Sequence, residues 1–309
     1  MTAAPISNDR LRRWAAIASL TTAITLILVK LAAYVLTGSV SLLSSLVDST
    51  VDALASLVTM IGIHYGLQPA DRSHRYGHGK SEPLAALGQA FFITGSAVLL
   101  CYEAIGRLIN PQPVRAGMVG IGVMLFAILA TTALVSFQRY VIRRTGSVAI
   151  DADSLHYRGD LYMNLAVIAA LLLADATGLP WFDPVCALGI AAFLIHGAWR
   201  ISRASVDILM DRELDIRTRA RISAIVLAHP ETRGLHDLRT RSSGDRVFFE
   251  FHLELDPHLT LAQAHDITDQ VEEEIAQAFP NAETIIHQEP AGLADERLDE
   301  KLRRGAGRR

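Results

Sequence analysis

Two aspartates lie one helical turn apart inside an apolar stretch of the sequence. Asp48 and Asp52 fall within 40–67, where most of the other residues are apolar. Four residues make about one turn of an α-helix, so both carboxylates point to the same face. An aspartate at the centre of a bilayer costs roughly 2.5 to 3.5 kcal/mol, which makes a pair without a function an unfavourable arrangement. The pair therefore predicts a functional site.

A second pair repeats this spacing later in the chain, because His156 and Asp160 are also four residues apart. If the two helices meet, three carboxylates and one imidazole converge. These four ligands suit a tetrahedral divalent cation, and zinc is the first expectation. The alternative is that Asp48 and Asp52 cap or solvate a helix end, or pair with Lys30 or an arginine. The matched second pair favours the metal site.

Membrane-spanning helices are the elements that must position these residues. The chain has 309 residues, of which 50% are hydrophobic and 20% charged, and the apolar ones are concentrated before residue 210. A helix needs about 20 mostly apolar residues to cross about 30 Å of hydrocarbon. We expect six such helices, over 14–37, 40–67, 84–109, 117–137, 153–174 and 184–199. The fifth reaches this length only with its charged residues included, and the sixth is short.

Positive residues set the expected orientation of these helices. Arginine and lysine are frequent before the first span, between the second and third, and after the fourth, and they are rare in the other loops. Such residues favour the cytoplasmic side of a membrane. We therefore expect a multi-pass membrane protein with both termini in the cytoplasm.

Overall charge and cysteine content exclude two other classes of protein. The formal net charge of −3 provides no basic field for nucleic acid, so no nucleic-acid partner is expected. The two cysteines, Cys101 and Cys186, lie in apolar stretches, where thiols usually pack as small hydrophobes. No disulfide framework is expected.

A small soluble domain follows the last span. Apolar and polar residues alternate over 247–255, which predicts a half-buried strand, and apolar residues recur every fourth position over 261–279, which predicts a helix. With a helix before Pro230 and strands over 235–241 and 283–288, the order is αββαβ. The expected organisation is a six-helix membrane domain over 1–211, an α+β domain over 212–290 and a flexible basic tail over 291–309.

Four motifs make the sequence resemble the cation diffusion facilitator (CDF) family, most closely its bacterial zinc/proton antiporters of the YiiP type. The motifs are Asp48-Ser-Thr-Val-Asp52, the loop from Gln68-Pro69-Ala70-Asp71 to Gly77-His78-Gly79-Lys80, Leu155-His156-Tyr157 to Asp160, and His236-Asp237-Leu238-Arg239-Thr240-Arg241. The resemblance implies a homodimer in the bacterial inner membrane with a metallochaperone-like cytoplasmic domain, a fold that the αββαβ order fits independently. It also implies that the positions of the two spaced pairs form the transport site. A histidine in that site accompanies zinc and cadmium preference in the family.

The resemblance implies two further metal sites and one charge pair. The first site is in a loop, where Asp71, His74 and His78 place one carboxylate and two imidazoles within eight residues. Without the family, a solvated loop would be an equally good interpretation. The second site lies in the cytoplasmic domain, and its matching residues are His236, His252, His265, His287 and Glu289. The glutamate stands where the family has an aspartate, and its extra methylene alters the geometry expected for one half of a two-metal cluster. The charge pair matches Lys80 and Asp211, at the junction of the two domains.

These features together predict a divalent metal cation efflux transporter. The expected activity is export of Zn²⁺, with Cd²⁺ or Fe²⁺ as alternatives, in exchange for protons, by alternating access of a homodimer. Metal binding requires deprotonated ligands and therefore releases protons, which links the two ions. The expected partners are a second copy of the chain, the lipid bilayer, divalent metal ions and protons. Zinc is expected as both substrate and structural ion, and no organic cofactor is expected.

Two other classes of function compete with transport. A membrane-anchored zinc sensor or binding module would carry nothing, and the carboxylates of Asp48 and Asp52 would then be dispensable. An intramembrane metal enzyme ranks last, because the sequence has no His-Glu-x-x-His motif and a closed tetrahedral site leaves no open position for a substrate. The sequence leaves the physiological metal open among zinc, cadmium, iron, manganese and cobalt.

Overall fold

The computed structural model describes residues 7–110, 118–177, 181–293 and 297–306. The chain divides into two compact units, Met1–Val206 and Asp207–Arg309. This division lies close to residue 211, where the sequence predicts the membrane domain to end.

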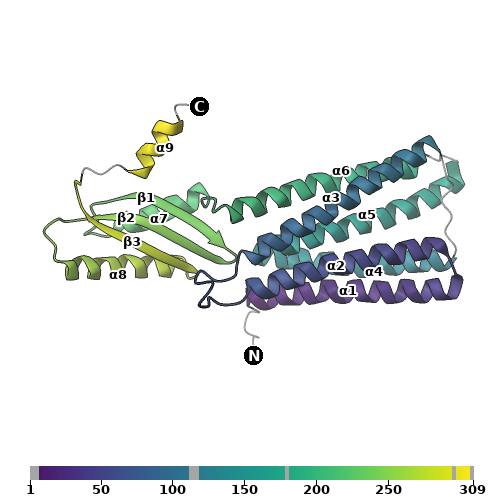
Figure 1. Ribbon diagram of the computed structural model, residues 1–309, viewed down its shortest axis with the longest axis horizontal. Helices are drawn as coiled ribbons and strands as arrows, with labels where there is room; N and C mark the ends of the chain where they lie inside the picture. Colours follow the sequence, from purple (N-terminus) through teal and green to yellow (C-terminus); the bar gives the residue numbers. More distant parts are fainter. Residues whose placement is uncertain (1–6, 111–117, 178–180, 294–296, 307–309) are drawn as a thin grey trace. The chain divides into compact units, whose positions relative to one another are not determined.

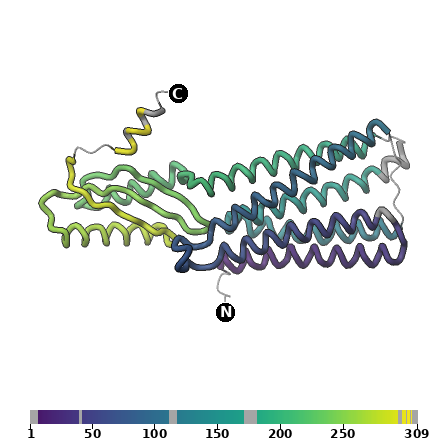
Figure 2. Tube along the Cα trace, in the orientation of Figure 1, coloured from purple at the N-terminus to yellow at the C-terminus, as the bar shows by residue number. Residues whose placement is uncertain are grey.

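Six long helices account for most of the described part of the first unit (Figures 1 and 2). They are α1 (Asn8–Thr37), α2 (Val40–Gly66), α3 (Ser81–Ile109), α4 (Met118–Thr145), α5 (Val148–Thr177) and α6 (Phe182–Leu209). Local sequence sets the ends of α1: the hydroxyl of Ser7 accepts a hydrogen bond from the backbone N–H of Arg10, and Gly38 ends the helix with a φ of 63°. Such a left-handed residue is the common stop signal of a helix, and glycine adopts it without strain.

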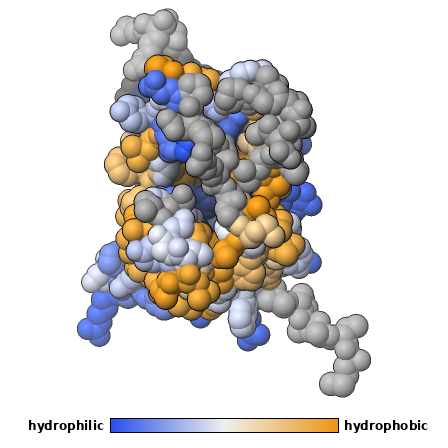
Figure 3. All heavy atoms as spheres, turned by 90° about the vertical axis from the view of Figure 1, so that its right-hand side faces the viewer, coloured by the Kyte–Doolittle hydropathy of each residue, from blue (hydrophilic) through white to orange (hydrophobic). Residues whose placement is uncertain are grey.

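Five of these helices are long and apolar enough, among the described residues, to cross a membrane. The exception is α5, which carries Asp151, Asp153, Arg158 and Asp160 and is still 30 residues long. Large apolar side chains project outward from the helices, and Figure 3 shows such residues over much of one face. Leu36, Phe91 and Tyr102 are 82%, 78% and 81% exposed, as suits side chains that contact lipid. The expected helical membrane domain is confirmed.

Small residues allow these helices to approach one another closely. α1 packs against α2 and α4, and α3 packs against α2 and α5. The buried core between them is rich in alanine, including Ala15, Ala86 and Ala90. At the crossing of α2 and α3, a Cβ added to Gly62 would lie 2.3 Å from the Cβ of Ala85. This is the packing expected of membrane helices, which associate through close van der Waals contact.

A buried ion pair joins three helices at one end of this unit. The guanidinium of Arg12 on α1 lies 3.6 Å from the carboxylate of Glu82 on α3, and it also donates a hydrogen bond to the carbonyl of Thr145 at the end of α4. The side chains of Arg12 and Glu82 are only 4% and 5% exposed. Removing either partner would leave a buried charge uncompensated, which typically costs 3 to 5 kcal/mol.

The second unit is a three-stranded sheet with helices on one face (Figure 1). Its elements are α7 (Ile216–Ala228), β1 (Gly234–Ser243), β2 (Arg246–Leu255), α8 (Leu261–Ala278), β3 (Ala282–Pro290) and α9 (Leu298–Ala306). The sheet order is β1-β2-β3, with β1 antiparallel and β3 parallel to β2. The αββαβ order is therefore confirmed over 216–290.

Alternation along β2 separates the two faces of the sheet. Phe249, Phe251 and Leu253 are buried in a core with Ile222 of α7 and Val271 of α8. The intervening residues point to the opposite face because successive side chains of a strand alternate. That second face carries His236, His252 and His287.

The C-terminal helix α9 lies inside the segment for which the sequence predicts a flexible tail. Leu298–Ala306 is helical, and α9 contacts β1. Hydrogen bonds from a distant part of the chain explain this difference. The carboxylate of Asp237 on β1 accepts from the backbone N–H groups of Leu298 and Asp299, at 2.8 and 2.9 Å.

Candidate metal sites

The intramembrane site brings residues of α2 and α5 together. Asp52 comes from α2, and His156 and Asp160 come from successive turns of α5. The Nε2 atom of His156 lies 2.9 Å from Oδ1 of Asp52 and 3.6 Å from Oδ2 of Asp160. One donor atom from each residue lies within 4.8 Å of the others. Two carboxylate oxygens and an imidazole nitrogen at this spacing form a donor set for one divalent cation.

The orientation of His156 is consistent with ligation. Its Nε2 atom is buried, and in the described part of the chain it makes no hydrogen bond of acceptable geometry, although Asp52 and Asp160 lie close by. Burying a polar atom without a hydrogen bond is costly and calls for an explanation, of which a bound ion is one. A bound cation would satisfy this nitrogen.

Asp48 occupies the preceding turn of α2, where it is exposed, and it is not part of the group of three donor atoms. The ammonium of Lys30, considered above as a partner for the aspartates, donates instead to Oγ of Ser49 at 2.6 Å and to the carbonyl of Ser45 at 3.1 Å. The structure therefore brings together three of the four predicted ligands.

A buried hydrogen-bond network holds α5 in place beside this site. The carboxylate of Asp153, one turn before His156, is 1% exposed. It accepts hydrogen bonds from Gln138 of α4 at 2.6 Å, Ser56 of α2 at 3.2 Å and Gln89 of α3 at 3.4 Å. Neutral donors from three helices thus meet one carboxylate of α5. Hydrogen bonds from several helices to one buried carboxylate restrain the position of the groups around it.

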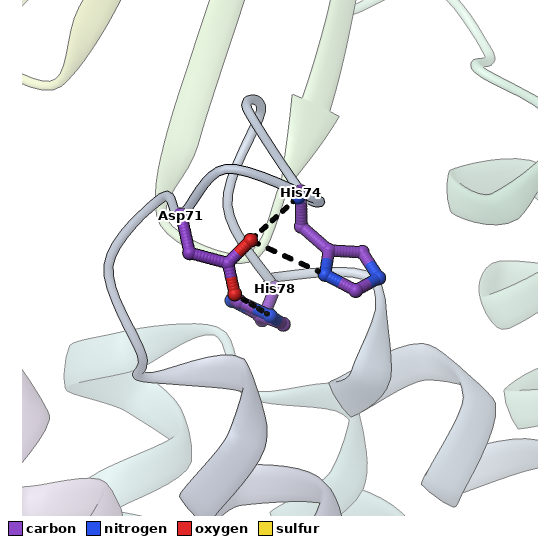
Figure 4. A group of neighbouring side chains, drawn as sticks. All are labelled: Asp71, His74 and His78. Carbon is purple, nitrogen blue, oxygen red and sulfur yellow. Dashed lines mark hydrogen bonds and ion pairs between the residues drawn. The ribbon is translucent and has the colours of Figure 1, made fainter.

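The loop site is compact, as Figure 4 shows. Oδ1 of Asp71 lies 3.5 Å from Nδ1 of His74, and Oδ2 lies 3.5 Å from Nε2 of His78. The other ring nitrogen of His78 is 3.2 Å from the carbonyl of Pro69, which can only accept, so the nitrogen facing Asp71 is free to bind a cation. Backbone N–H groups of His74 and Ser73 lower the pKa of Asp71 below its ordinary value of 3.8 and keep it ionised.

The cytoplasmic site lies across neighbouring strands. His236 of β1 is paired with His252 of β2, which is paired in turn with His287 of β3. The carboxylate of Glu289 lies 2.8 Å from Nε2 of His236 and 3.2 Å from Nδ1 of His252. His236, His252 and Glu289 each place one donor atom within 4.8 Å of the others. The longer glutamate side chain therefore reaches both imidazoles.

The other two predicted residues of this domain differ in position. The ring of His287 lies next to that of His252, with 4.7 Å between centroids. His265 is on the exposed surface of α8, where its Nδ1 lies 3.5 Å from the carboxylate of Asp269. His287 thus borders the three-residue group, and His265 lies outside it.

Glu254 is a residue of this site that the sequence analysis did not identify. Its Oε1 atom lies 3.1 Å from Nδ1 of His236. The available signal was the alternation of β2, which places Glu254 on the same face as His252 two residues earlier.

The predicted charge pair lies across the division between the units. Lys80 belongs to the first unit and Asp211 to the second, and their pairing stays a prediction. Within the second unit, the guanidinium of Arg241 lies 3.8 Å from the carboxylate of Asp211.

Comparison with known proteins gives extensive similarity. The cation efflux transmembrane domain matches residues 16–210, and the cytoplasmic domain of cation efflux proteins matches residues 214–291. The cation-efflux pump FieF of Shewanella oneidensis is 49% identical over 273 residues, covering 88% of this chain and 92% of the relative. FieF of Klebsiella pneumoniae is 47% identical over 292 residues, covering 93% and 95%. A solved structure of CzrB in its zinc form is 35% identical and covers 28% of this chain and 99% of its own, with a TM-score of 0.26.

Proposed function

The chain belongs to the cation diffusion facilitator family of divalent metal cation efflux transporters, and on this basis we propose that it exports Zn²⁺ from the cytoplasm in exchange for protons. The observation that carries the proposal is the convergence of Asp52, His156 and Asp160, from two membrane helices, on one position. Asp48 is proposed as the fourth ligand, because it lies one turn from Asp52 on the same face of α2.

The donor set is compatible with zinc as substrate and explains the exchange for protons. Carboxylate oxygens and an imidazole nitrogen suit zinc, and the same set also accepts cadmium or iron(II). Zinc binds only deprotonated carboxylates and neutral imidazole, so zinc and protons exclude one another from the site. This exclusion is the basis of the proposed antiport.

A proton gradient supplies the driving force for export. Each pH unit is worth about 1.4 kcal/mol per proton. If the site opens alternately to the two sides of the membrane, protons that enter from outside displace the metal ion. The metal ion then leaves the cell against its own concentration gradient. The proposed location is the bacterial inner membrane, with both termini in the cytoplasm. The transport cycle needs no covalent chemistry.

The loop site and the cytoplasmic site are proposed to bind zinc as a structural ion in a homodimer. In the cytoplasmic site, the contacts of Glu289 with both His236 and His252 fit one shared ion, in spite of the extra methylene relative to aspartate. When bound, zinc would crosslink neighbouring strands β1, β2 and β3. His287 and His265 are proposed to contribute to a second ion or to the contact between protomers.

Zinc uptake into proteoliposomes tests the transport proposal. The wild-type protein is reconstituted with an imposed pH difference, and zinc entry is followed with a trapped fluorescent indicator. Asp52→Ala should abolish uptake that depends on the pH difference, whereas Glu103→Gln, a carboxylate at the exposed end of α3, should retain it. Equal uptake by wild type and Asp52→Ala would overturn the proposal and favour a membrane-anchored sensor. Competition with cadmium, iron(II), manganese and cobalt in the same assay ranks the metals.

A further inference from the structure

The first turn of α9 is held by a side chain from β1. The carboxylate of Asp237 accepts hydrogen bonds from the backbone N–H groups of Leu298 and Asp299, and the backbone N–H of Asp237 donates to Oδ2 of Asp299 at 3.2 Å. These reciprocal bonds resemble a helix cap, with the capping residue supplied from a distant strand. The register of β1 shifts between His236 and Arg239, and Asp237 has a φ of 54° within this irregularity. Aspartate tolerates that conformation better than most residues.

A second contact links the start of α9 to the cytoplasmic site. The guanidinium of Arg297, just before α9, binds Oε1 of Glu254. The same oxygen lies 3.1 Å from Nδ1 of His236, whose Nε2 lies 2.8 Å from Glu289. A continuous chain of polar contacts therefore runs from α9 through Glu254 to the metal-binding face.

The surroundings of Glu254 are shaped to hold its carboxylate. Gly234 lies opposite it in the β1–β2 register, and a Cβ added to Gly234 would lie 2.8 Å from Oε2 of Glu254. The absence of a side chain on β1 therefore provides the space that the carboxylate occupies. The side chain of Glu254 is 14% exposed, so its pairing with Arg297 and His236 takes place largely away from water.

This arrangement sets the direction in which His236 can bind a metal. An ionised carboxylate can only accept, so Nδ1 of His236 carries the proton and donates it to Glu254. The lone pair of the neutral ring is then on Nε2, which faces Glu289. Outer carboxylates of this kind fix the tautomer and orientation of ligating histidines, and their removal typically lowers metal affinity by 10- to 100-fold.

We propose that Glu254 is a positioning residue of the cytoplasmic metal site and that, through Arg297, it couples metal binding to the docking of α9. The inference rests on the proposed function, because it takes His236, His252 and Glu289 as zinc ligands. Zinc fixes His236, His236 fixes the carboxylate of Glu254, and the fixed carboxylate binds Arg297 more strongly. The coupling is reciprocal, so a docked α9 also raises zinc affinity.

Zinc affinity of the full-length protein in detergent tests the positioning role. Zinc binding is measured by competition with a fluorescent chelator, and the cytoplasmic component is identified as the part lost in His252→Ala. Glu254→Ala should weaken this component by roughly 10- to 100-fold. Glu254→Gln should restore much of the loss, because the amide oxygen still accepts from Nδ1. The matched control is Glu250→Ala, on the same face of β2 and opposite Arg239. Equal affinity in Glu254→Ala and Glu250→Ala would overturn the positioning role.

A spin label on α9 tests the coupling independently of transport. Leu302, which is 62% exposed, is replaced by cysteine and labelled in a Cys101→Ala, Cys186→Ala background. Zinc should reduce the mobility of the label in the otherwise unchanged protein, and Glu254→Ala or Arg297→Ala should remove that response. A zinc response of the label that persists in Arg297→Ala would overturn the coupling. So would a label that does not respond to zinc in the otherwise unchanged protein, if that protein still shows the zinc binding that His252→Ala removes.

The two proposals fail in different measurements. Zinc binding that His252→Ala does not change would overturn the cytoplasmic site and this inference with it. Zinc flux that Asp52→Ala does not change would overturn the transport proposal and leave the affinity and mobility results valid.

Discussion

His156 is the residue through which the intramembrane site is organised, because its Nε2 atom faces carboxylates from two helices at 2.9 and 3.6 Å. The other donors would repel one another without a cation or proton between them. Each carboxylate therefore stabilises the site only when the ion is bound. This dependence makes single charge-removing substitutions informative.

Asp160→Asn should weaken zinc binding at the transport site and abolish zinc-driven proton exchange. The amide keeps the volume of the carboxylate but removes its charge, and we expect an affinity loss of at least roughly 10- to 100-fold, the range found even for outer partners of a ligand. Asn164→Ala, one turn further along α5, is the control and should bind zinc normally. Unchanged zinc affinity in Asp160→Asn would show that Asp160 is not a ligand.

At the scale of single residues, sequence identifies a candidate where the residue is chemically out of place. Asp52 is conspicuous because an aspartate in an apolar helix is costly. His156 and Asp160 stand out because they repeat the four-residue spacing of Asp48 and Asp52. Glu254 is not conspicuous, because glutamate is ordinary on the polar face of a strand. Its role depends on the register of β1 and β2, and on the space opposite it at Gly234.

Helix contacts in the first unit depend on small side chains at specific crossings, and Gly62 is the tightest example described above. Gly62→Ala should destabilise the protein, although alanine favours helix formation, because overpacking typically costs 1 to 3 kcal/mol. Gly95→Ala is the matched control, since an added Cβ there meets no described atom within 4 Å. This control substitution should leave the free energy of unfolding unchanged or raise it by up to about 1 kcal/mol. Thermal unfolding in detergent measures both, and an equal effect of the two changes would contradict the tight crossing.

The cap of α7 predicts a local dependence on pH. Asp215 accepts hydrogen bonds from the hydroxyl of Thr218 at 2.6 Å and from the backbone N–H groups of Thr218 and Arg217, and these bonds lower its pKa from the ordinary value of 3.8. Because the folded-state pKa is the lower one, the stabilisation is complete above pH 3.8 and is lost as the pH falls through the folded-state value.

Amide hydrogen exchange over the first turn of α7 measures this effect, expressed as protection factors at each pH. Protection in the wild type should fall toward that of Asp215→Ala as the carboxyl group becomes protonated, and the two proteins should differ most near neutral pH. A wild-type protein whose advantage over Asp215→Ala persists at the lowest pH would contradict the prediction.

Element boundaries show where apolar patterning is informative and where it is not. The sequence predicts the sixth span over 184–199, whereas α6 extends over Phe182–Leu209. An apolar stretch in the sequence indicates only the part of a helix that would lie in the hydrocarbon of a membrane. The helix itself continues beyond that part into a more polar segment. The helix α9 has no comparable signal, because Asp237, the residue that caps it, is about sixty positions earlier in the chain.

On the scale of the whole molecule, the chain combines two compact units with candidate metal sites in each. The order of the elements up to β3 could be predicted, because long apolar stretches mark the spans of the first unit, while alternating and fourth-residue apolar patterns mark the strands and helices of the second. The pairing of Lys80 with Asp211 could not be settled in the same way, because it depends on how the two units meet.

Zinc should stabilise the whole protein in proportion to the number of occupied sites. A ligand at 100 times its Kd stabilises the folded state by about 2.7 kcal/mol per site. The midpoint temperature of thermal unfolding should therefore rise when zinc is added and fall back when a chelator removes it. Asp52→Ala and His252→Ala should each remove a different part of this rise. A shift that both variants retain in full would place the stabilising zinc elsewhere.

The hydrogen bonds that converge on Asp153 have a consequence for how an ion changes sides. Any sliding of α5 relative to α2, α3 and α4 would strip a fully buried carboxylate of several donors at once. These four helices are therefore expected to travel as one rigid body that carries the ion with it. Release of the ion to the far side must then come from tilting of these four helices together, or from rearrangement of the parts of the protein around them. The ligands keep their mutual distances throughout.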